Sequence, residues 1–260
     1  MYINPFSIAL TGPRYSGKTG VSKIFRSMGI PVFDADIVIK YILNYNEEIT
    51  TQVKNFFGNS YVICDYINPI AFDNDEKFNS LIDLVEFDLF EAYYKFQKKN
   101  KKSVYTIFKS SLIFERNYQK KFNHTISVFS PKEERISRYS MRTGTTLEKA
   151  HSLFKGEMDE MRKNQLSDFI IHNYQGSEDI KKQIQLIDDK IVDKYFSINA
   201  NKTDMEDILP GTFPKNMDKA WKSSEWLDSI DDKRHKNKNY KNSENKYNSV
   251  DNHSHIKNLA

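Results

Sequence analysis

The sequence has little of what secreted and membrane-spanning proteins need. Cys64 is the only cysteine among 260 residues, so no disulfide can form within the chain, which fits a reducing compartment. The first ten residues, MYINPFSIAL, contain neither a basic segment nor a long apolar one, and no run of eighteen apolar residues occurs. We therefore expect a cytoplasmic protein that is neither secreted nor bound to a membrane.

Outside the C-terminal part, positive and negative side chains are nearly balanced in number. The formal net charge is +4 and the pI is about 8.8, but much of this excess comes from the lysine-rich C-terminus. A nucleic-acid site needs basic side chains gathered on a folded surface. We therefore expect no nucleic-acid partner.

The C-terminal part has few apolar side chains. Residues 231–260 are mainly Lys, Asn, Ser, Asp and His, so burial cannot offset the entropy lost in ordering them. The character of the chain already changes near Ser197. We predict one domain over residues 1–196 and a mostly disordered tail over residues 197–260, whose partner the sequence leaves open.

Glycine is scarce too, yet three of the nine glycines lie between positions 12 and 20. The octapeptide GPRYSGKT, residues 12–19, matches the phosphate-binding loop pattern and lies between an apolar strand pattern and a helical one. Gly12 and Gly17 permit backbone angles that turn successive N–H groups toward a phosphate, and the following helix adds its positive end. The alternative is a chance glycine turn before a helix.

This loop predicts a site for ATP and Mg²⁺. Lys18 is expected to reach the terminal phosphates, and the Thr19 hydroxyl is the expected ligand of Mg²⁺. The predicted nucleotide-binding residues of the loop are Gly12, Pro13, Arg14, Tyr15, Ser16, Gly17, Lys18 and Thr19.

Apolar runs of strand length alternate with helical patterns along the chain. This order predicts an α/β fold, in which helices flank both faces of a parallel sheet and ligands bind at the carboxyl ends of the strands. The predicted strands are 6–10, 30–33, 103–108, 125–129 and 169–172, and the predicted helices include 18–28, one or two within 37–57, and 76–99.

Two carboxylates follow the second predicted strand. Asp34 and Asp36 are two residues apart, so both side chains point toward the loop if the strand geometry persists. One carboxylate can accept a proton, and the other can hold metal-bound water or position a substrate hydroxyl. The alternative is that both cap the next helix, where aspartate is favoured.

Three arginines form the second group of charged residues. Arg135, Arg138 and Arg142 are three and four residues apart, so on a helix they share a face about 60° wide. Their mutual repulsion is offset if this face meets phosphates, which guanidinium groups bind bidentately. Pairing with Glu133, Glu134 or other acids is the alternative.

Several segments together resemble dephospho-coenzyme A kinase in their order and spacing. They are IALTGPRYSGKTG, the helix ending in MGI, PVFDADIVIK, SSLIFERNYQKKFNHTISVFSPKEERISRYSMR and EMDEMRKNQLSDFIIHN. The resemblance covers most of residues 6 to about 190, and DAD and LSDFIIHN are its most specific parts. It implies a P-loop NTPase-type kinase fold with a helical substrate-binding region at about 60–100 and a lid at about 138–165.

The resemblance also implies a reaction, the transfer of the γ-phosphate of ATP to the ribose 3′-hydroxyl of dephospho-coenzyme A. By this analogy Asp36 is the catalytic base and Asp34 assists it. Arg138 and Arg142 match lid arginines that meet the phosphates of ATP, and Asn173 lies near the adenine.

Some positions depart from the family pattern and leave the small-molecule acceptor open. The loop usually reads GGIGSGK in this family, so Arg14 adds a charge beside the phosphates. Arg14 and Lys40 are cations that suit a nucleoside or deoxynucleoside monophosphate acceptor, which is the first alternative. A P-loop protein that binds nucleotide without transferring phosphate is the second alternative. The departures are Pro13, Arg14 and Tyr15 in the loop, Lys40 for arginine, Asp83 and Leu84 near a usual His-Pro pair, and Glu157 for glutamine.

Overall fold

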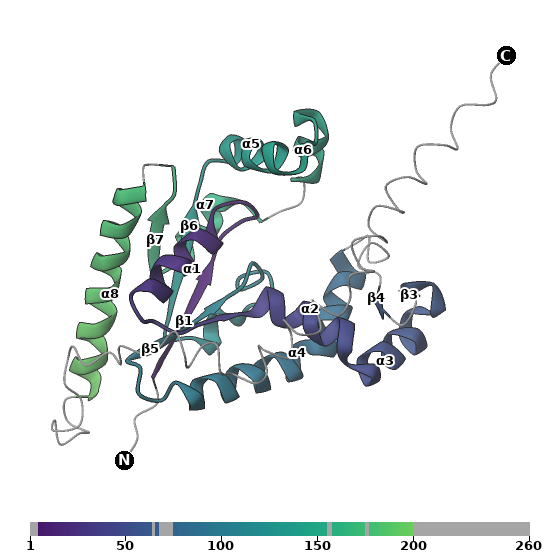
Figure 1. Ribbon diagram of the computed structural model, residues 1–260, viewed down its shortest axis with the longest axis horizontal. Helices are drawn as coiled ribbons and strands as arrows, with labels where there is room; N and C mark the ends of the chain where they lie inside the picture. The colour runs from purple at the N-terminus through teal and green to yellow at the C-terminus, as the bar shows by residue number, and fades with distance from the viewer. Residues whose placement is uncertain (1–4, 64–65, 68–74, 155–157, 175–176, 200–260) are drawn as a thin grey trace. The chain divides into compact units, whose positions relative to one another are not determined.

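The computed structural model describes residues 5–63, 66–67, 75–154, 158–174 and 177–199, and Figure 1 shows their arrangement. The strands are β1 (Phe6–Thr11), β2 (Val32–Asp34), β3 (Val62–Ile63), β4 (Tyr66–Ile67), β5 (Tyr105–Lys109), β6 (His124–Phe129) and β7 (Phe169–His172). The helices are α1 (Lys18–Ser27), α2 (Ala35–Tyr45), α3 (Glu47–Phe57), α4 (Asp75–Lys99), α5 (Lys132–Thr143), α6 (Leu147–Leu153), α7 (Glu160–Gln165) and α8 (Ser177–Asn199), with short 3₁₀ turns at Asn59–Tyr61 and Tyr118–Lys121.

Five strands form one parallel sheet in the order β2-β5-β1-β6-β7. β1 lies in the middle, and all six of its residues are buried. Because successive side chains of a strand face opposite sides, Ile8 and Leu10 belong to one core cluster and Ala9 to the other. A strand that is buried on both faces reads as a continuous apolar run, which is why FSIAL predicts it.

Helices cover both faces of this sheet. Phe25 of α1 and Ile184 of α8 lie in the core cluster on one face, whereas Val38 of α2 and Val85 of α4 lie in the cluster on the other. Figure 1 shows α8 and α4 on different sides of the strands. The predicted α/β fold with a helix-flanked parallel sheet is therefore confirmed.

Several element boundaries differ from the predictions. β2 ends at Asp34 and α2 begins directly at Ala35, so the second carboxylate of the pair lies on a helix. The region predicted as one or two helices holds two, and the chain breaks between them at Asn46, whose side chain caps α3. α8 extends to Asn199, three residues beyond the predicted domain end at 196. The rest of the predicted tail lies outside the described residues.

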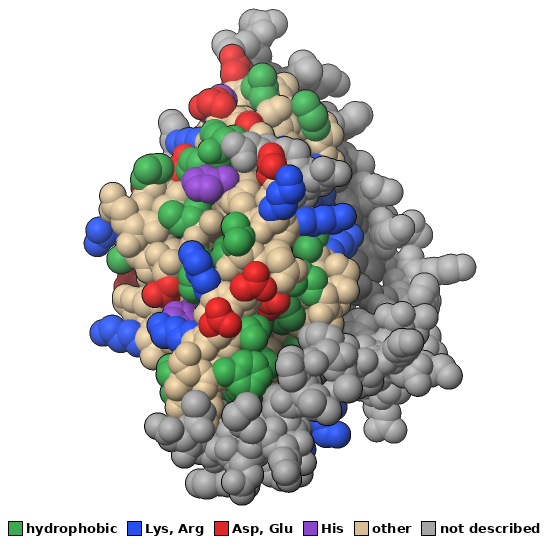
Figure 2. Space-filling model, turned by 90° about the vertical axis from the view of Figure 1, so that its left-hand side faces the viewer, with side chains coloured by type: hydrophobic (Ala, Val, Ile, Leu, Met, Phe, Trp, Pro, Cys, Tyr) green, Lys and Arg blue, Asp and Glu red, His purple; other side chains and the backbone are tan. Residues whose placement is uncertain are grey.

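The surface of the described part gives two further observations. None of its helices is both long and apolar enough to cross a membrane. On the face shown in Figure 2, the side chains of lysine, arginine, aspartate and glutamate are interspersed over the described residues.

Candidate active site

The phosphate-loop pattern forms a tight backbone turn between β1 and α1. Gly12 has a φ of 144° and Gly17 a φ of 98°, both in the region that favours glycine. A Cβ on Gly12 would lie 2.5 Å from the carbonyl oxygen of Val128, and one on Gly17 would lie 1.8 Å from Nδ2 of Asn173. Neither position has space for a side chain, so the two glycines are required by the backbone, as predicted.

The donors of the loop fit a phosphate group. α1 begins at Lys18, no side chain caps its first N–H groups, and its first turn holds no acid. Free N–H groups at a helix N-terminus bind anions, and the helix dipole adds a partial positive charge. Ser16 adds a buried hydroxyl oxygen that has no hydrogen-bond partner among the described residues. The loop and the start of α1, which together we call the cradle, therefore offer hydrogen-bond donors to an anion.

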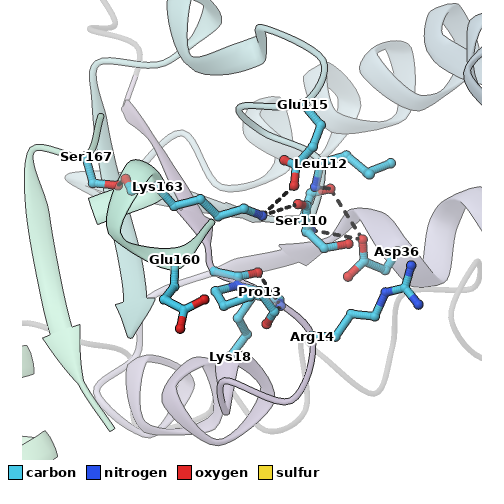
Figure 3. Close-up of polar contacts among 12 residues, drawn as sticks. Pro13, Arg14, Lys18, Asp36, Ser110, Leu112, Glu115, Glu160, Lys163 and Ser167 are labelled. Carbon is cyan, nitrogen blue, oxygen red and sulfur yellow. Dashed lines mark hydrogen bonds and ion pairs between the residues drawn. The ribbon is translucent and has the colours of Figure 1, made fainter. Parts of the chain in front are cut away.

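Lys18 and Thr19 occupy the two positions that the pattern assigns to phosphate and metal. The Nζ of Lys18 donates to the carbonyl oxygens of Gly12 at 2.7 Å and Pro13 at 2.9 Å (Figure 3). The ammonium group therefore lies beside the first residues of the loop. Lys18 is buried, whereas Thr19, the next residue of α1, is exposed. Its hydroxyl is thus accessible beside the cradle.

The two carboxylates both lie at the carboxyl ends of the strands, but on different elements. Asp34 ends β2, and its Oδ2 accepts from the Nζ of Lys109 at the end of β5. Asp36 lies in the first turn of α2, where its Oδ1 accepts from the Oγ of Ser110 and the N–H of Ser111, both at 3.3 Å. The argument from strand alternation is therefore wrong, because the chain becomes helical at Ala35.

Asp34 also carries part of the alternative role in helix capping. Its Oδ1 accepts from the N–H of Ile37 at 3.4 Å, which makes it the N-cap of α2. Asp36 is not the cap. Its carboxylate faces the end of β5, and Figure 3 shows the side chain of Arg14 extending toward it. Asp34 is thus paired with Lys109, whereas Asp36 is held by hydrogen bonds to Ser110 and Ser111.

Polar residues at the end of β5 complete this edge, and the sequence prediction missed them. Lys109 and Ser110 are buried, at 6% and 1% exposed. Lys163 of α7 is 2% exposed, and its Nζ contacts Glu115 at 2.6 Å and the carbonyl oxygen of Ser111 at 3.2 Å (Figure 3). The run KSS follows a predicted central strand at its carboxyl end, and that position is the signal that could have identified it.

The three arginines of α5 do not form a single phosphate-facing surface. Arg135 is 1% exposed and donates to the carboxylate of Glu160 at 3.0 Å, so the acid-pairing alternative holds for it. Arg138 is partly buried and pairs with Glu134 at 2.8 Å. Arg142 is exposed near the end of the helix. The three positions lie on one helical face, as expected, but that face is partly buried and Arg135 is paired with an acid. The phosphate role of Arg138 and Arg142 stays a prediction.

Asn173 is fixed to the loop by hydrogen bonds. Its Nδ2 donates to the carbonyl oxygen of Ser16 at 2.6 Å, and its own carbonyl oxygen accepts from Arg138 at 2.7 Å. Its N–H donates to the carbonyl oxygen of Phe129 at the end of β6. The structure thus brings Asn173, Arg138 and the loop together, and the place of Asn173 near the adenine stays a prediction.

The remaining departures lie on helices α2 and α4 or outside the described residues. Asp83 of α4 forms an ion pair with Arg116, and Leu84 packs against a core cluster. Lys40 of α2 is exposed. Glu157 lies outside the described residues.

Comparison with known proteins places this geometry in a family. The family model for dephospho-CoA kinase matches residues 6–179. The dephospho-CoA kinase of Pseudoalteromonas translucida (strain TAC 125) is 29% identical over 177 residues, which are 66% of this chain and 84% of that protein. The dephospho-CoA kinase of Buchnera aphidicola subsp. Schizaphis graminum is 31% identical over 175 residues, 65% of this chain and 82% of that protein.

Solved structures agree with the fold. The Thermus thermophilus protein TT1252 gives a TM-score of 0.62 at 22% identity and is matched over 77% of this chain and all of its own length. Dephospho-CoA kinase from Campylobacter jejuni gives a TM-score of 0.53 at 21% identity, over 72% of this chain and 98% of its own.

Proposed function

The chain belongs to the dephospho-CoA kinase family, and from that premise we propose how its residues transfer a phosphoryl group from ATP to the ribose 3′-hydroxyl of dephospho-coenzyme A. A kinase of this kind must bind the donor phosphates, accept the proton of the attacking hydroxyl and stabilise the charge that develops. Each task falls to a different group of residues at the carboxyl edge of the sheet.

The loop and the start of α1 bind the donor. The N–H groups of the loop and the Nζ of Lys18 would contact the phosphates, and the hydroxyl of Thr19 would hold Mg²⁺. When bound, ATP supplies the transferred phosphoryl group and Mg²⁺ neutralises part of its charge. The uncapped helix end and the buried Ser16 hydroxyl support this assignment. The neighbouring loop residues Pro13, Arg14 and Tyr15 complete the cradle.

Asp36 accepts the proton, and one observation carries this assignment. Its carboxylate is held by Ser110 and Ser111 at 3.3 Å, at the edge where the loop also ends. These two bonds orient the carboxylate and leave Oδ2 for a substrate hydroxyl. A ribose hydroxyl must lose its proton as it attacks, so a fixed carboxylate is the group that this acceptor requires.

Asp34 assists Asp36 indirectly. Because Asp34 is paired with Lys109 and caps α2, it fixes the start of the helix that carries the base. Arg138, which contacts the loop and Asn173, and Arg142 stabilise charge on the phosphates. Asn173 itself borders the nucleotide on the side of β7.

A side-by-side assay with Mg²⁺-ATP tests the proposed acceptor. Dephospho-coenzyme A and the common nucleoside monophosphates are offered at equal concentration, and ADP release and the phosphorylated product are measured. We expect dephospho-coenzyme A to be the preferred acceptor. Exclusive turnover of a monophosphate would favour the first alternative, with Arg14 and Lys40 as its cations. ATP binding without turnover of any acceptor would favour the non-catalytic alternative.

A further inference from the structure

Tyr15 has a backbone conformation that its side chain disfavours. Its φ is 58°, and Asn117 is the only other non-glycine residue with positive φ in the described part of the chain. Asparagine tolerates this left-handed region, whereas a bulky aromatic residue there is an outlier that surrounding contacts must hold. The contacts of Tyr15 therefore show what fixes the loop at this point.

The ring of Tyr15 packs into a small aromatic cluster on the predicted lid. Its centroid lies 5.0 Å from that of Tyr139 on α5, at 85°, and 6.2 Å from that of Phe154, which follows α6. Tyr139 and Phe154 lie 5.8 Å apart at 70°. Edge-to-face pairs of this kind stabilise beyond burial alone. The buried side chains of Ile136 and Ala150 complete the cluster.

Two arginines of α5 hold the backbone at the same point. Arg135 donates to the carbonyl oxygen of Arg14 at 3.1 Å, and Arg138 donates to that of Tyr15 at 3.4 Å. Arg135 is itself fixed, since it is 1% exposed, paired with Glu160 and 5.3 Å from the ring of Phe154. Arg14 and Tyr15, which we call the loop crest, are thus bound to α5 through both backbone and side chain.

The direction of these carbonyl groups matters for the phosphate site. In a trans peptide the C=O of one residue and the N–H of the next point in opposite directions. Because the carbonyl oxygen of Arg14 accepts from Arg135, the N–H of Tyr15 points away from that guanidinium group of α5. A loop whose N–H groups are fixed before an anion binds needs no reordering, and such preorganisation raises affinity.

We propose that Tyr15 is a positioning residue that, together with Arg135, fixes the loop crest to helices α5 and α6 and so holds the loop ready for the phosphates of ATP. The inference rests on the proposed function only in that ATP is the ligand. It assigns Tyr15 an effect on nucleotide affinity through the ring of Tyr139, and none on the chemical step.

A double-mutant cycle tests the coupling between the two rings. Tyr15→Gly removes the ring and leaves a residue that adopts the observed φ freely, and Tyr139→Ala removes its partner on α5. The dissociation constant of Mg²⁺-ATP is measured by calorimetry, and kcat is measured at saturating ATP. We expect Tyr15→Gly to raise the ATP dissociation constant about tenfold with kcat within about threefold of wild type. Tyr94→Ala, which removes an exposed aromatic ring from α4, is the matched control and should change neither.

The double variant decides whether the rings act together. If they do, Tyr15→Gly/Tyr139→Ala binds ATP no more weakly than the more affected single variant. Additive losses, unchanged affinity in Tyr15→Gly, or a loss confined to kcat would each overturn the proposal. A wild-type protein that binds ATP but phosphorylates no acceptor would refute the proposed function and leave the affinity measurements of this test intact, whereas one that does not bind ATP overturns both.

Discussion

The phosphate loop is shaped by its backbone, whereas the carboxylate side of the candidate site is shaped by charged side chains. The loop depends on the φ angles of Gly12 and Gly17 and on carbonyl groups bound by Lys18. The carboxylate side depends on Asp34 and Asp36, each held by residues at the end of β5. The turn of the loop is specified within one short segment, although α5 and α6 hold its crest, whereas the carboxylate side forms only where two segments meet.

This difference predicts how each side fails when it is altered. Removing a side chain from the loop leaves the cradle folded, so the loss appears in binding and catalysis. On the carboxylate side, Asp34 and Lys109 have side chains only 12% and 7% exposed, so removing one partner leaves a buried charge. Substitutions on the two sides can therefore be separated by measuring activity and stability on the same variants.

The largest effect is expected at Lys18. Lys18→Ala removes the ammonium group beside the first residues of the loop, and we expect a loss of about 10⁴-fold in kcat/KM, comparable to removal of another phosphate-stabilising cation in phosphoryl transfer. Lys23→Ala, an exposed lysine on the same helix, is the control. Steady-state kinetics measure kcat/KM, and the melting temperature of the variant should be unchanged. Full activity in Lys18→Ala would refute the assignment of the loop.

Asp36 should give the next largest effect and separates catalysis from binding. Asp36→Asn keeps an acceptor for Ser110 and Ser111 but removes the base, so we expect kcat to fall about 10³-fold while the dissociation constant of ATP stays within about twofold. Calorimetry and single-turnover kinetics on one preparation measure both. A collapse of ATP affinity instead would mean that Asp36 acts on the metal or on the fold.

The same contrast explains what the sequence could predict. The turn between β1 and α1, the positive φ angles of its two glycines and the five-stranded α/β fold followed from local patterns, and the structure confirms them. The pairing of Asp34 with Lys109 could not be predicted in this way, because the two residues are 75 apart in the sequence and meet through the register of β2 on β5. The inward position of Arg135 was missed for a related reason, since spacing along α5 defines a face but not the neighbour that covers it.

Asp34 should affect stability more than chemistry. Asp34→Asn leaves Lys109 buried without its carboxylate, and we expect a loss of about 3 kcal/mol in the free energy of unfolding. Asp83→Asn breaks an ion pair in which the aspartate side chain is 62% exposed, so its effect should be much smaller. Denaturant unfolding measures both. Adding Lys109→Met to Asp34→Asn should recover part of the loss. Because asparagine caps a helix as well as aspartate does, unchanged stability in Asp34→Asn would show that Asp34 stabilises the fold mainly by capping α2.

The smallest effect is expected on α5, where two arginines that the sequence treats alike differ in their contacts. Arg138 donates to the carbonyl oxygens of Tyr15 and Asn173, whereas Arg142 is exposed. We expect Arg138→Ala to lower kcat/KM about tenfold, since one charge-assisted contact is worth about 1.5 kcal/mol, and Arg142→Ala to lower it about twofold. Lys132→Ala, an exposed lysine on the same helix, controls for the loss of a positive charge. If Arg142→Ala proves the more damaging, α5 must move when nucleotide binds, and the phosphate-loop side would then depend on side-chain contacts as much as the carboxylate side does.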